Sequence, residues 1–300
     1  MSLQHKLAAG HFVITAEVVP PVSADPQALV DKALPLAALA DAINITDGAG
    51  ARTHLDALTA AGLLVRQGIE PVLQVTCRDR NRIALQSLLL GAAAQGVRNL
   101  LMLAGDDPRA GDQPDAKSVF DLDSRGLLET ARAMRDRGAL PHGRAIGGRA
   151  EFFLGCADLP IDPPPHWRPD HLARKLDAGA QFVQTQFCMD AQVARRYLER
   201  LVEHGIAQRA PILIGLGPLY SVQSARWMRE HLFGTIIPDT LIERLQAAAD
   251  VKREGRRICV ELIHAMQAIP GVAGVHLMAP GHDSTLPDVI QTYRAESAVR

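Results

Sequence analysis

The sequence predicts a (β/α)8 barrel, which is a closed ring of eight parallel strands with helices between them. Short apolar runs rich in β-branched residues alternate with stretches of helical periodicity, and eight such runs occur along the 300 residues. No GxGxxG motif follows the first run, as it would in a dinucleotide-binding doubly wound sheet. We therefore expect one barrel domain spanning residues 1–300, with an extra helix late in the chain.

The stretch from Gln74 to Pro108 has the repeating unit in its clearest form. Apolar residues at three- and four-residue spacing follow a polar turn and predict a helix that ends at Gly96. A second apolar run, residues 97–103, predicts a buried strand that leads directly into Asp106 and Asp107. The unit therefore places two carboxylates at the carboxyl end of a strand, where parallel α/β folds carry their chemistry.

The remaining elements follow from the same patterns in chain order. Residues 12–19 alternate and are rich in β-branched side chains, and Pro20 and Pro21 end this first strand. Further strands are expected at residues 41–46, 72–75, 97–103, 150–156, 181–187, 211–216 and 272–277. Helices are expected at residues 26–39, 54–66, 83–95, 124–137, 171–178, 191–204, 222–232 and 251–269, with one more starting at 236–238. Ser124 and Ser221 are placed as N-caps, and the long loop 109–124 is typical of a binding loop.

The charge balance and the cysteines disfavour several functions. The net charge is −1, so no charge excess draws the chain to nucleic acid or to an acidic membrane surface, and a small-molecule ligand is expected. The four cysteines have no CxxC or Cys/His spacing, which disfavours a metal site and a disulfide framework. The first residues lack an apolar signal region, and no apolar run has membrane-spanning length. We expect a soluble, cytoplasmic protein, with homo-oligomer formation left open.

In a barrel the functional side chains gather where the strands end, so candidates can be named from position alone. They are Glu17, Asn44, Thr46, Asp47, Gln74, Thr76, Asp106, Asp107, Cys156, Asp158, Gln184, Gln186 and His276. Glu17 is the most specific, because a residue followed by two valines in a strand must face the barrel interior or the helix layer. Both are poorly solvated, and burial favours the protonated carboxyl group, which suits a general acid. The alternative is a structural ion pair with an arginine on a neighbouring strand.

Other candidates also have structural alternatives. Asp106 and Asp107 could act on a ligand or cap an ordinary turn. Gln184 and Gln186 lie on one face of a strand, where their amides need a ligand or a neighbouring strand as partner. Lys175 could reach a phosphate, but a lone helical lysine is more typical of a solvated face.

Two further features are open in the same way. His276 fits a core histidine with satisfied hydrogen bonds better than it fits a ligand contact. Three arginines close together could hold phosphates or simply be solvated, and they are Arg78, Arg80 and Arg82.

Several stretches together resemble the methylenetetrahydrofolate reductase family. They are TAEVVPP in the first strand, NITDGAG in the second, QVTCRDRNRIALQ in the third unit, LMLAGDDP in the fourth, KLDAGAQFVQTQF into the sixth, and LYS followed by IIP in the seventh. They occur in the family order and cover nearly the whole chain. The RDRN and AGDDP variants are similar to the stand-alone bacterial branch of the family.

The resemblance implies a flavin-bearing barrel that uses NADH or NADPH to reduce 5,10-methylenetetrahydrofolate to 5-methyltetrahydrofolate, with FAD expected and FMN the alternative. Glu17 matches the family's general acid, which protonates N10 of the folate. Asp106 matches the aspartate beside the flavin and the pterin. Gln186 matches the glutamine that contacts folate or nicotinamide, and Gln184 is placed with the substrate on the same face. The positions expected to bind the cofactor are Thr46, Asp47, Gln74, Gly105, Asp106, Ala157, His171, Arg174 and Lys175.

The chain departs from the family pattern at several ligand-contact positions. Gln74 stands where relatives have a histidine, and Ala104 stands where many have an arginine. Further departures are the Cys156-Ala157-Asp158 segment in place of an aromatic or Asn-Pro contact, Arg229 in place of an aromatic residue, and His282 in place of an arginine. These departures leave the identity of the flavin and the strength of its binding open. Two other functions also stay open. One is a pterin-binding barrel that transfers a methyl group with a corrinoid protein, and the other is a partner subunit that has lost its flavin.

Overall fold

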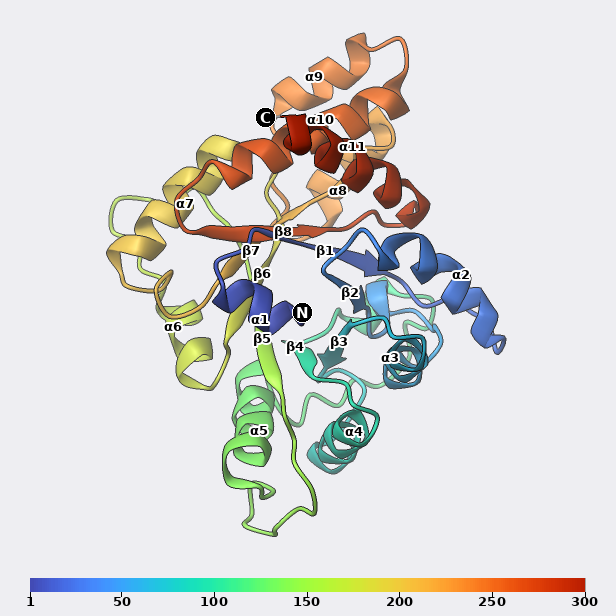
Figure 1. The fold of residues 1–300 in the computed structure, drawn as a ribbon, viewed down its shortest axis with the longest axis vertical. Coiled ribbons are helices and arrows are strands. Elements are labelled where there is room, and N and C mark those ends of the chain that lie inside the picture. The colour runs from blue at the N-terminus through green and yellow to red at the C-terminus, as the bar shows by residue number, and fades with distance from the viewer. Residues whose placement is uncertain (300) are drawn as a thin grey trace.

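Eight parallel strands close into a barrel in the order in which they occur in the chain, so the predicted (β/α)8 fold is confirmed (Figure 1). The computed structural model describes residues 1–299. The strands are β1 (Val13–Val18), β2 (Ala42–Ile45), β3 (Pro71–Thr76), β4 (Asn99–Leu103), β5 (Phe153–Asp158), β6 (Phe182–Phe187), β7 (Ile212–Leu216) and β8 (Val272–Leu277). The pairing of β1 with β8 closes the ring.

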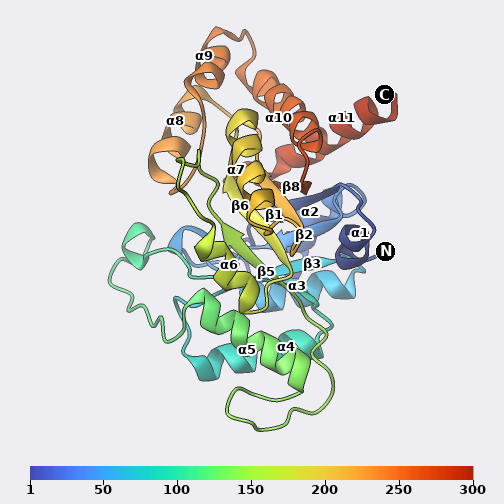
Figure 2. The same cartoon turned by 90° about the vertical axis from the view of Figure 1, so that its left-hand side faces the viewer.

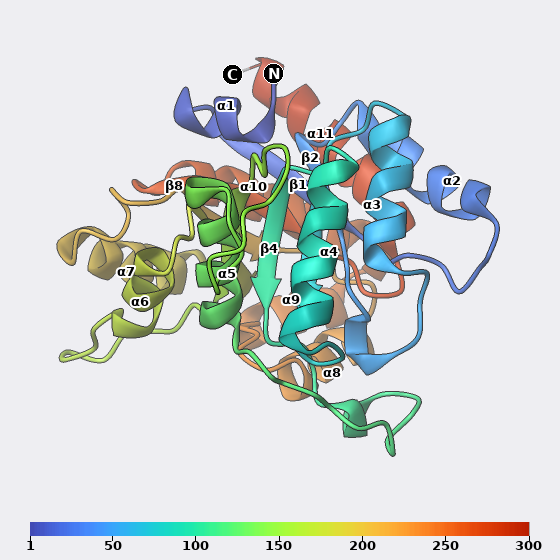
Figure 3. The ribbon, with the colours of Figure 1, turned by 90° about the horizontal axis from the view of Figure 1, so that it is seen from below.

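Helices connect the strands and surround the barrel (Figures 1 and 2). They are α1 (Leu3–Ala8), α2 (Pro26–Ala37), α3 (Ala57–Arg66), α4 (Arg82–Ala94), α5 (Ser124–Arg137), α6 (Asp170–Asp177), α7 (Ala191–Glu203), α8 (Val222–His231), α9 (Asp239–Ala247), α10 (Val251–Gln267) and α11 (Leu286–Val299). Seen from below, β4 lies between α4 and α5 (Figure 3). The predicted extra helix late in the chain is α9, which lies between α8 and α10.

The barrel interior is apolar at the amino ends of the strands. Phe153 and Phe182 stack there with ring centroids 4.8 Å apart. Glu70 Oε1 accepts hydrogen bonds of 2.9 Å from the Leu3 N–H and from Asn99 Nδ2, which fastens α1 across this end. The buried cluster consists of Val13, Ala42, Val72, Leu101, Phe153, Phe182 and Leu213 from the strands, with Leu3 and Leu7 from α1. The short helix α1 therefore closes the lower end of the barrel.

The next inward positions along the strands are polar. Because strand side chains alternate with a period of two, a residue two positions beyond a member of the apolar cluster lies on the same inner face. Thr15, Asn44, Gln74 and Gln184 occupy such positions, and all of them are buried. A polar layer thus lies between the apolar lower end and the mouth of the barrel.

Helix α5 has a different N-cap from the one that the sequence predicts. The Asp123 side chain accepts a hydrogen bond of 2.7 Å from the Gly126 N–H, and Ser124 is the first helical residue. A carboxylate and a hydroxyl stand next to each other here, and both are good caps. The choice between them depends on the backbone conformation that the preceding loop imposes.

Strand β5 begins and ends later than predicted, at Phe153 and Asp158. The Phe152 N–H is used in a tight turn to the Ala150 carbonyl oxygen, and sheet pairing starts with the Phe153 N–H bonded to Arg98. The apolar residues before Phe153 are buried but not paired. Two helices were not predicted, α1 and α11, and the helix predicted to start at residues 236–238 begins only after Pro238.

Candidate active site

Glu17 lies on the inner face of β1 near the mouth of the barrel, and its side chain is 15% exposed. Its Oε2 accepts a hydrogen bond of 3.0 Å from Gln74 Nε2 on β3, and His276 Nε2 on β8 lies 3.7 Å from the same oxygen. Within residues 1–299, no arginine pairs with Glu17 and its Oε1 accepts no hydrogen bond. The predicted alternative, an ion pair with an arginine, is therefore wrong.

His276 joins the polar layer to Glu17. It is 3% exposed, and its Nδ1 lies 3.0 Å from Thr15 Oγ1. Nδ1 has the satisfied bond that a core histidine needs, as the sequence predicts. Nε2 nevertheless faces Glu17, so His276 also belongs to the surroundings of the candidate acid.

Gln184 lies deep in the barrel, and both ends of its amide have protein partners. Its Oε1 accepts from Asn44 Nδ2 at 2.7 Å, and its Nε2 donates to Asn44 Oδ1 at 3.1 Å and to Thr15 Oγ1 at 3.0 Å. Gln184 is 2% exposed, so the structure holds it beneath the mouth. Gln186, two residues further along β6, is partly exposed, and its Oε1 accepts from the Phe187 N–H at 3.0 Å.

Asp106 is exposed in the loop after β4, and its Oδ2 accepts a hydrogen bond of 2.9 Å from the Gly50 N–H. This bond ties the loop after β4 to the loop after β2. Gly105 has a φ of +97°, and a Cβ there would lie 2.9 Å from Arg78 Cβ and 3.1 Å from Thr76 Cβ. Both the backbone angle and the close approach require glycine.

Asp107 has the turn-capping role that the sequence left open for the two neighbouring carboxylates. It accepts a hydrogen bond of 2.9 Å from the Arg109 N–H and pairs with the Arg109 guanidinium at 2.5 Å. These bonds lower the pKa of Asp107 to about 2. Asp106, by contrast, forms no ion pair with any of residues 1–299.

Asp47 fastens the ends of β2 and β3 together. Its Oδ2 accepts from the Thr76 N–H and hydroxyl, both at 2.9 Å, and from Arg80 at 2.6 Å. Thr46, directly before it, is 2% exposed, and its Oγ1 is buried without a partner. The Asp47 carboxylate therefore joins the two strands, whereas the Thr46 hydroxyl has no hydrogen-bond partner among residues 1–299.

The three clustered arginines all have acidic partners. Arg78 pairs with Asp79 at 2.7 Å, Arg80 with Asp47 at 2.6 Å, and Arg82 with Asp121 at 2.7 Å. The last pair holds the loop 109–124 against the start of α4. The cluster consists of ion pairs, which is neither of the two expectations from the sequence.

Three basic residues on α6 lie near the carboxyl end of β5. Lys175 is partly buried and donates a hydrogen bond of 2.6 Å to the Ala157 carbonyl oxygen, so it is not on a solvated face. Arg174 and His171 are exposed beside it. Burial lowers the pKa of His171, and the charge of Lys175 lowers it further. Arg174 and Lys175 therefore provide the positive charge on this helix, and Lys175 lies at the end of β5.

Asp158 lies at the end of β5 and is hydrogen-bonded to the hydroxyl of Tyr197, a fully buried residue of α7. Burial raises the pKa of Asp158, although the Tyr197 hydrogen bond and the charge of Lys175 oppose this effect. The folded protein therefore holds this proton more tightly than the unfolded chain does. The free energy of unfolding should fall as the pH rises from the unfolded pKa, about 4, through the folded pKa.

Asp158→Asn is expected to remove this pH dependence and to keep the contact with Tyr197, because the amide oxygen still accepts. The free energy of unfolding of the variant minus that of the parent should be larger at pH 8 than at pH 4. Urea unfolding of both proteins at both pH values measures this difference. Asp162→Asn is the control with the opposite sign, because Arg196 lowers the pKa of Asp162. A stability difference for Asp158→Asn that is equal at both pH values would contradict the assignment.

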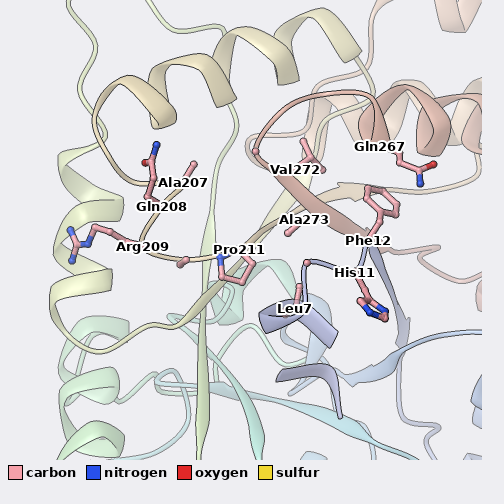
Figure 4. Close-up of a pocket in the computed structure, with 13 residues that line it drawn as sticks. Leu7, His11, Phe12, Ala207, Gln208, Arg209, Pro211, Gln267, Val272 and Ala273 are labelled. Atoms are coloured by element: carbon pink, nitrogen blue, oxygen red, sulfur yellow. The ribbon is translucent and has the colours of Figure 1, made fainter. Parts of the chain in front are cut away.

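Two hollows mark opposite ends of the barrel. One of about 420 Å³ lies beside the loops after β2, β3 and β4, where Asp47, Gly48 and Arg78 line it. The other, of about 470 Å³, lies at the amino ends of β7 and β8, where Pro211 and Ala273 line it (Figure 4). The first hollow shares Asp47 with the candidate residues, and neither hollow is lined by Glu17.

Two departures from the family pattern lie at the rim of the barrel. Arg229 pairs with Asp239 at 2.6 Å, which ties α8 to α9. His282 stacks on Tyr220 with ring centroids 3.5 Å apart, and Lys252 Nζ lies 4.4 Å from the centroid of the Tyr220 ring. Neither side chain contacts Glu17.

Thr15 is the residue of this site that the sequence reasoning missed. It lies two residues before Glu17 in β1 and therefore shares its face. That spacing was available as a signal, but a threonine in a strand is ordinary. Its importance comes from its two partners, His276 and Gln184, which lie far away in the sequence.

The fold and the site together define a (β/α)8 barrel protein with a partly buried carboxyl group near its mouth. The family model described as "Methylenetetrahydrofolate reductase" matches residues 2–293. The chain belongs to the methylenetetrahydrofolate reductase family.

Individual relatives agree with this. A probable methylenetetrahydrofolate reductase (NADPH) of Caenorhabditis elegans is 26% identical over 78% of this chain and 34% of its own length. The 5,10-methylenetetrahydrofolate reductase of Salmonella typhimurium is 27% identical over 61% of this chain and 56% of its own length. The chain thus spans between a third and just over half of the length of these relatives.

A solved structure shares the fold at low sequence identity. It is an uncharacterized protein from Clostridium thermocellum that binds two copies of 5-methyl-5,6,7,8-tetrahydrofolic acid, with a TM-score of 0.65 and 14% identity over 99% of this chain and 100% of that one. Among residues 1–299, no helix is both long and apolar enough to span a bilayer. The four cysteines are buried and unpaired.

Proposed function

We propose that this protein catalyses the reduction of 5,10-methylenetetrahydrofolate to 5-methyltetrahydrofolate with NADH or NADPH as the hydride source, through a bound flavin. The observation that carries the proposal is the position of Glu17. It is a largely buried carboxyl group at the mouth of the barrel, with one oxygen held by Gln74 and the other without a hydrogen bond to any of residues 1–299. Membership of the family, matched over residues 2–293, supports the choice of substrate.

The residues around the mouth fit a flavin. Thr46 Oγ1 is a buried hydroxyl without a partner, which suits a polar edge of a ring system. Arg174 and Lys175 on α6 provide positive charge for phosphate groups, and a diphosphate favours FAD over FMN. A flavin held there would accept a hydride from the nicotinamide and pass it to the folate. Of the predicted cofactor positions, Asp47 and Gln74 contribute indirectly, because their polar groups already bind Thr76, Arg80 and Glu17.

Each candidate side chain has a distinct role in this proposal. Glu17 gives its proton to N10 of the folate, so that the five-membered ring opens to a cationic iminium. The negative charge of Asp106 favours that cation. Gln186, whose Oε1 is engaged by the Phe187 N–H, has its Nε2 available for the folate or the nicotinamide. Lys175, His171 and Ala157 hold the cofactor side of the site.

The absorption spectrum of the purified protein, followed by anaerobic titration with NADH and with NADPH, tests this function. A yellow protein that bleaches with either nucleotide and regains its colour with methylenetetrahydrofolate is the expected result. A colourless protein that binds no added FAD or FMN would overturn the proposal. It would leave the corrinoid-dependent methyl transfer or the partner-subunit role to be tested.

Asp106→Asn should slow folate reduction by about 10²-fold, because the negative charge that favours the cationic iminium is lost. The loss of the same charge should raise the reduction potential of the flavin. The two half-reactions and the potential are measured separately. Asp107→Asn is the matched control, because it changes the neighbouring carboxylate that pairs with Arg109. An unchanged potential in Asp106→Asn would place this carboxylate away from the flavin.

A further inference from the structure

The polar layer below Glu17 forms one continuous chain of hydrogen bonds. It runs from Asn44 through Gln184 to Thr15 and His276, and His276 Nε2 then faces Glu17. Apart from Glu17, every member is at most 3% exposed. These buried groups have no water as a substitute partner, so each must find its hydrogen-bond partner within the chain. The donor or acceptor role of one residue therefore determines the role of the next.

The hydrogen-bond donors along this chain determine the tautomer of His276. Both N–H groups of the Gln184 amide are used, one on Asn44 Oδ1 and one on Thr15 Oγ1. Thr15 Oγ1 therefore accepts from Gln184 and still has its own proton to donate. Among residues 1–299, the partner that remains for this proton is His276 Nδ1, at 3.0 Å. An Nδ1 that accepts a hydrogen bond is unprotonated, so a neutral His276 has its proton on Nε2.

We propose that Gln184 is a positioning residue that sets the tautomer of His276 and, through it, the orientation of the proton on Glu17. This inference rests on the proposed function for its consequence in catalysis, but not for the tautomer itself. The chain places the Nε2–H of His276 toward Glu17 Oε2 at 3.7 Å, beside the Gln74 N–H that already donates to that oxygen. The hydrogen bond from Gln74 makes Oε2 an acceptor, and the nearby Nε2–H of His276 adds positive charge on the same side, so the proton that Glu17 donates is placed on Oε1.

The position of Oε1 explains how this chain of hydrogen bonds favours proton donation by Glu17. In the described part of the chain, Oε1 is the carboxyl oxygen without a hydrogen bond, so a proton held there can be given to a ligand. A proton on Oε2 would instead be opposed by the two N–H groups that face it. Gln184 acts across the barrel, through two intermediate side chains, without touching the substrate.

The tautomer can be read directly by NMR of protein labelled with ¹⁵N-histidine, without any substrate or turnover. A His276→Gln variant identifies the signals of His276. At pH 8 the expected spectrum has Nδ1 at the position of an unprotonated ring nitrogen and Nε2 at that of a protonated one. The reverse pattern, which would follow if both amides were turned over, or an imidazolium, would overturn the inference.

Two variants test whether Gln184 and Thr15 set this state. In Gln184→Glu the carboxylate has no N–H to give, so Thr15 should donate to it and His276 Nδ1 should become protonated. In Thr15→Val, which removes the donor at nearly constant shape, the Nδ1 signal should move toward the protonated position. Gln208→Glu, at an exposed glutamine, is the matched control and should leave His276 unchanged. If the His276 signals stay in place in both test variants, the inference fails even if the tautomer of the parent is correct.

The catalytic consequence is measured in the same variants. Thr15→Val should slow the folate half-reaction by about tenfold and change the nicotinamide half-reaction by less than about twofold, because only the former uses the Glu17 proton. An unchanged folate half-reaction with a shifted tautomer would overturn the link to Glu17. If the tautomer behaves as expected and the parent protein does not reduce methylenetetrahydrofolate, the proposed function fails and the positioning of His276 stands. Full activity in Glu17→Gln would refute the role of Glu17 as proton donor.

Discussion

Glu17→Gln is expected to slow the reduction of methylenetetrahydrofolate by about 10³-fold and to change the reduction of the flavin by NADH or NADPH by less than about twofold. The glutamine amide keeps the size of the side chain, and its oxygen can still accept the hydrogen bond from Gln74. It has no acidic proton for N10. Anaerobic stopped-flow measurement of the two half-reactions separates the effects.

The comparison needs a control that removes a carboxyl group of the same size elsewhere. Glu129→Gln, on an exposed position of α5, serves this purpose and should leave both half-reactions unchanged. Equal losses in the two half-reactions of Glu17→Gln would refute its role as proton donor. They would indicate instead that Glu17 supports the shape of the site.

Phe182→Ala is expected to lower the free energy of unfolding by about 4 kcal/mol, the usual range for deleting a fully buried aromatic ring. Phe182 is 0% exposed, stacks on Phe153 at 4.8 Å, and fills the space that Gly155 leaves in the barrel interior. Removing the ring leaves a cavity in the layer that supports Gln184. Chemical denaturation followed by circular dichroism measures the change.

Phe233→Ala provides the matched control for the loss of a phenylalanine. Phe233 is 83% exposed, so its removal should change the free energy of unfolding by less than about 0.5 kcal/mol. A similar small effect for Phe182→Ala would mean that the strands can close over the cavity. It would also mean that the apolar end of the barrel is less tightly packed than the structure indicates.

The barrel could be predicted from the sequence because its signal is repeated along the whole chain. A single apolar run is ambiguous, whereas an alternation of strands and helices points to one closed sheet. Local features were predicted less well. Helix α1 has only six residues and is held by Glu70 and by the barrel interior, which a sequence pattern does not contain. The start of β5 depends on a pairing with Arg98, not on the hydrophobicity of the residues before it.

The candidate acid could also be named from the sequence, but its surroundings could not. Alternation places Glu17 on one face of β1 without saying whether that face is the interior or the helix layer. Its partners, Gln74 and His276, come from strands that are its neighbours only after the ring has closed. The pairing of Asn44 with Gln184 crosses 140 residues of sequence and the width of the barrel. Such contacts depend on strand register, which no local pattern specifies.

Helix α1 covers the apolar cluster at the amino ends of the strands, so in the proposed reaction ligands reach Glu17 from the mouth of the barrel. In the proposed reaction, Glu17 loses the proton that it donates in each cycle, and the apolar layer below the polar side chains disfavours the entry of water from that end. The proton that restores Glu17 then enters through the mouth of the barrel, by which the reduced folate also leaves. Release of the product and reprotonation of Glu17 therefore occur one after the other. A ligand that stays bound at the mouth would keep Glu17 without its proton.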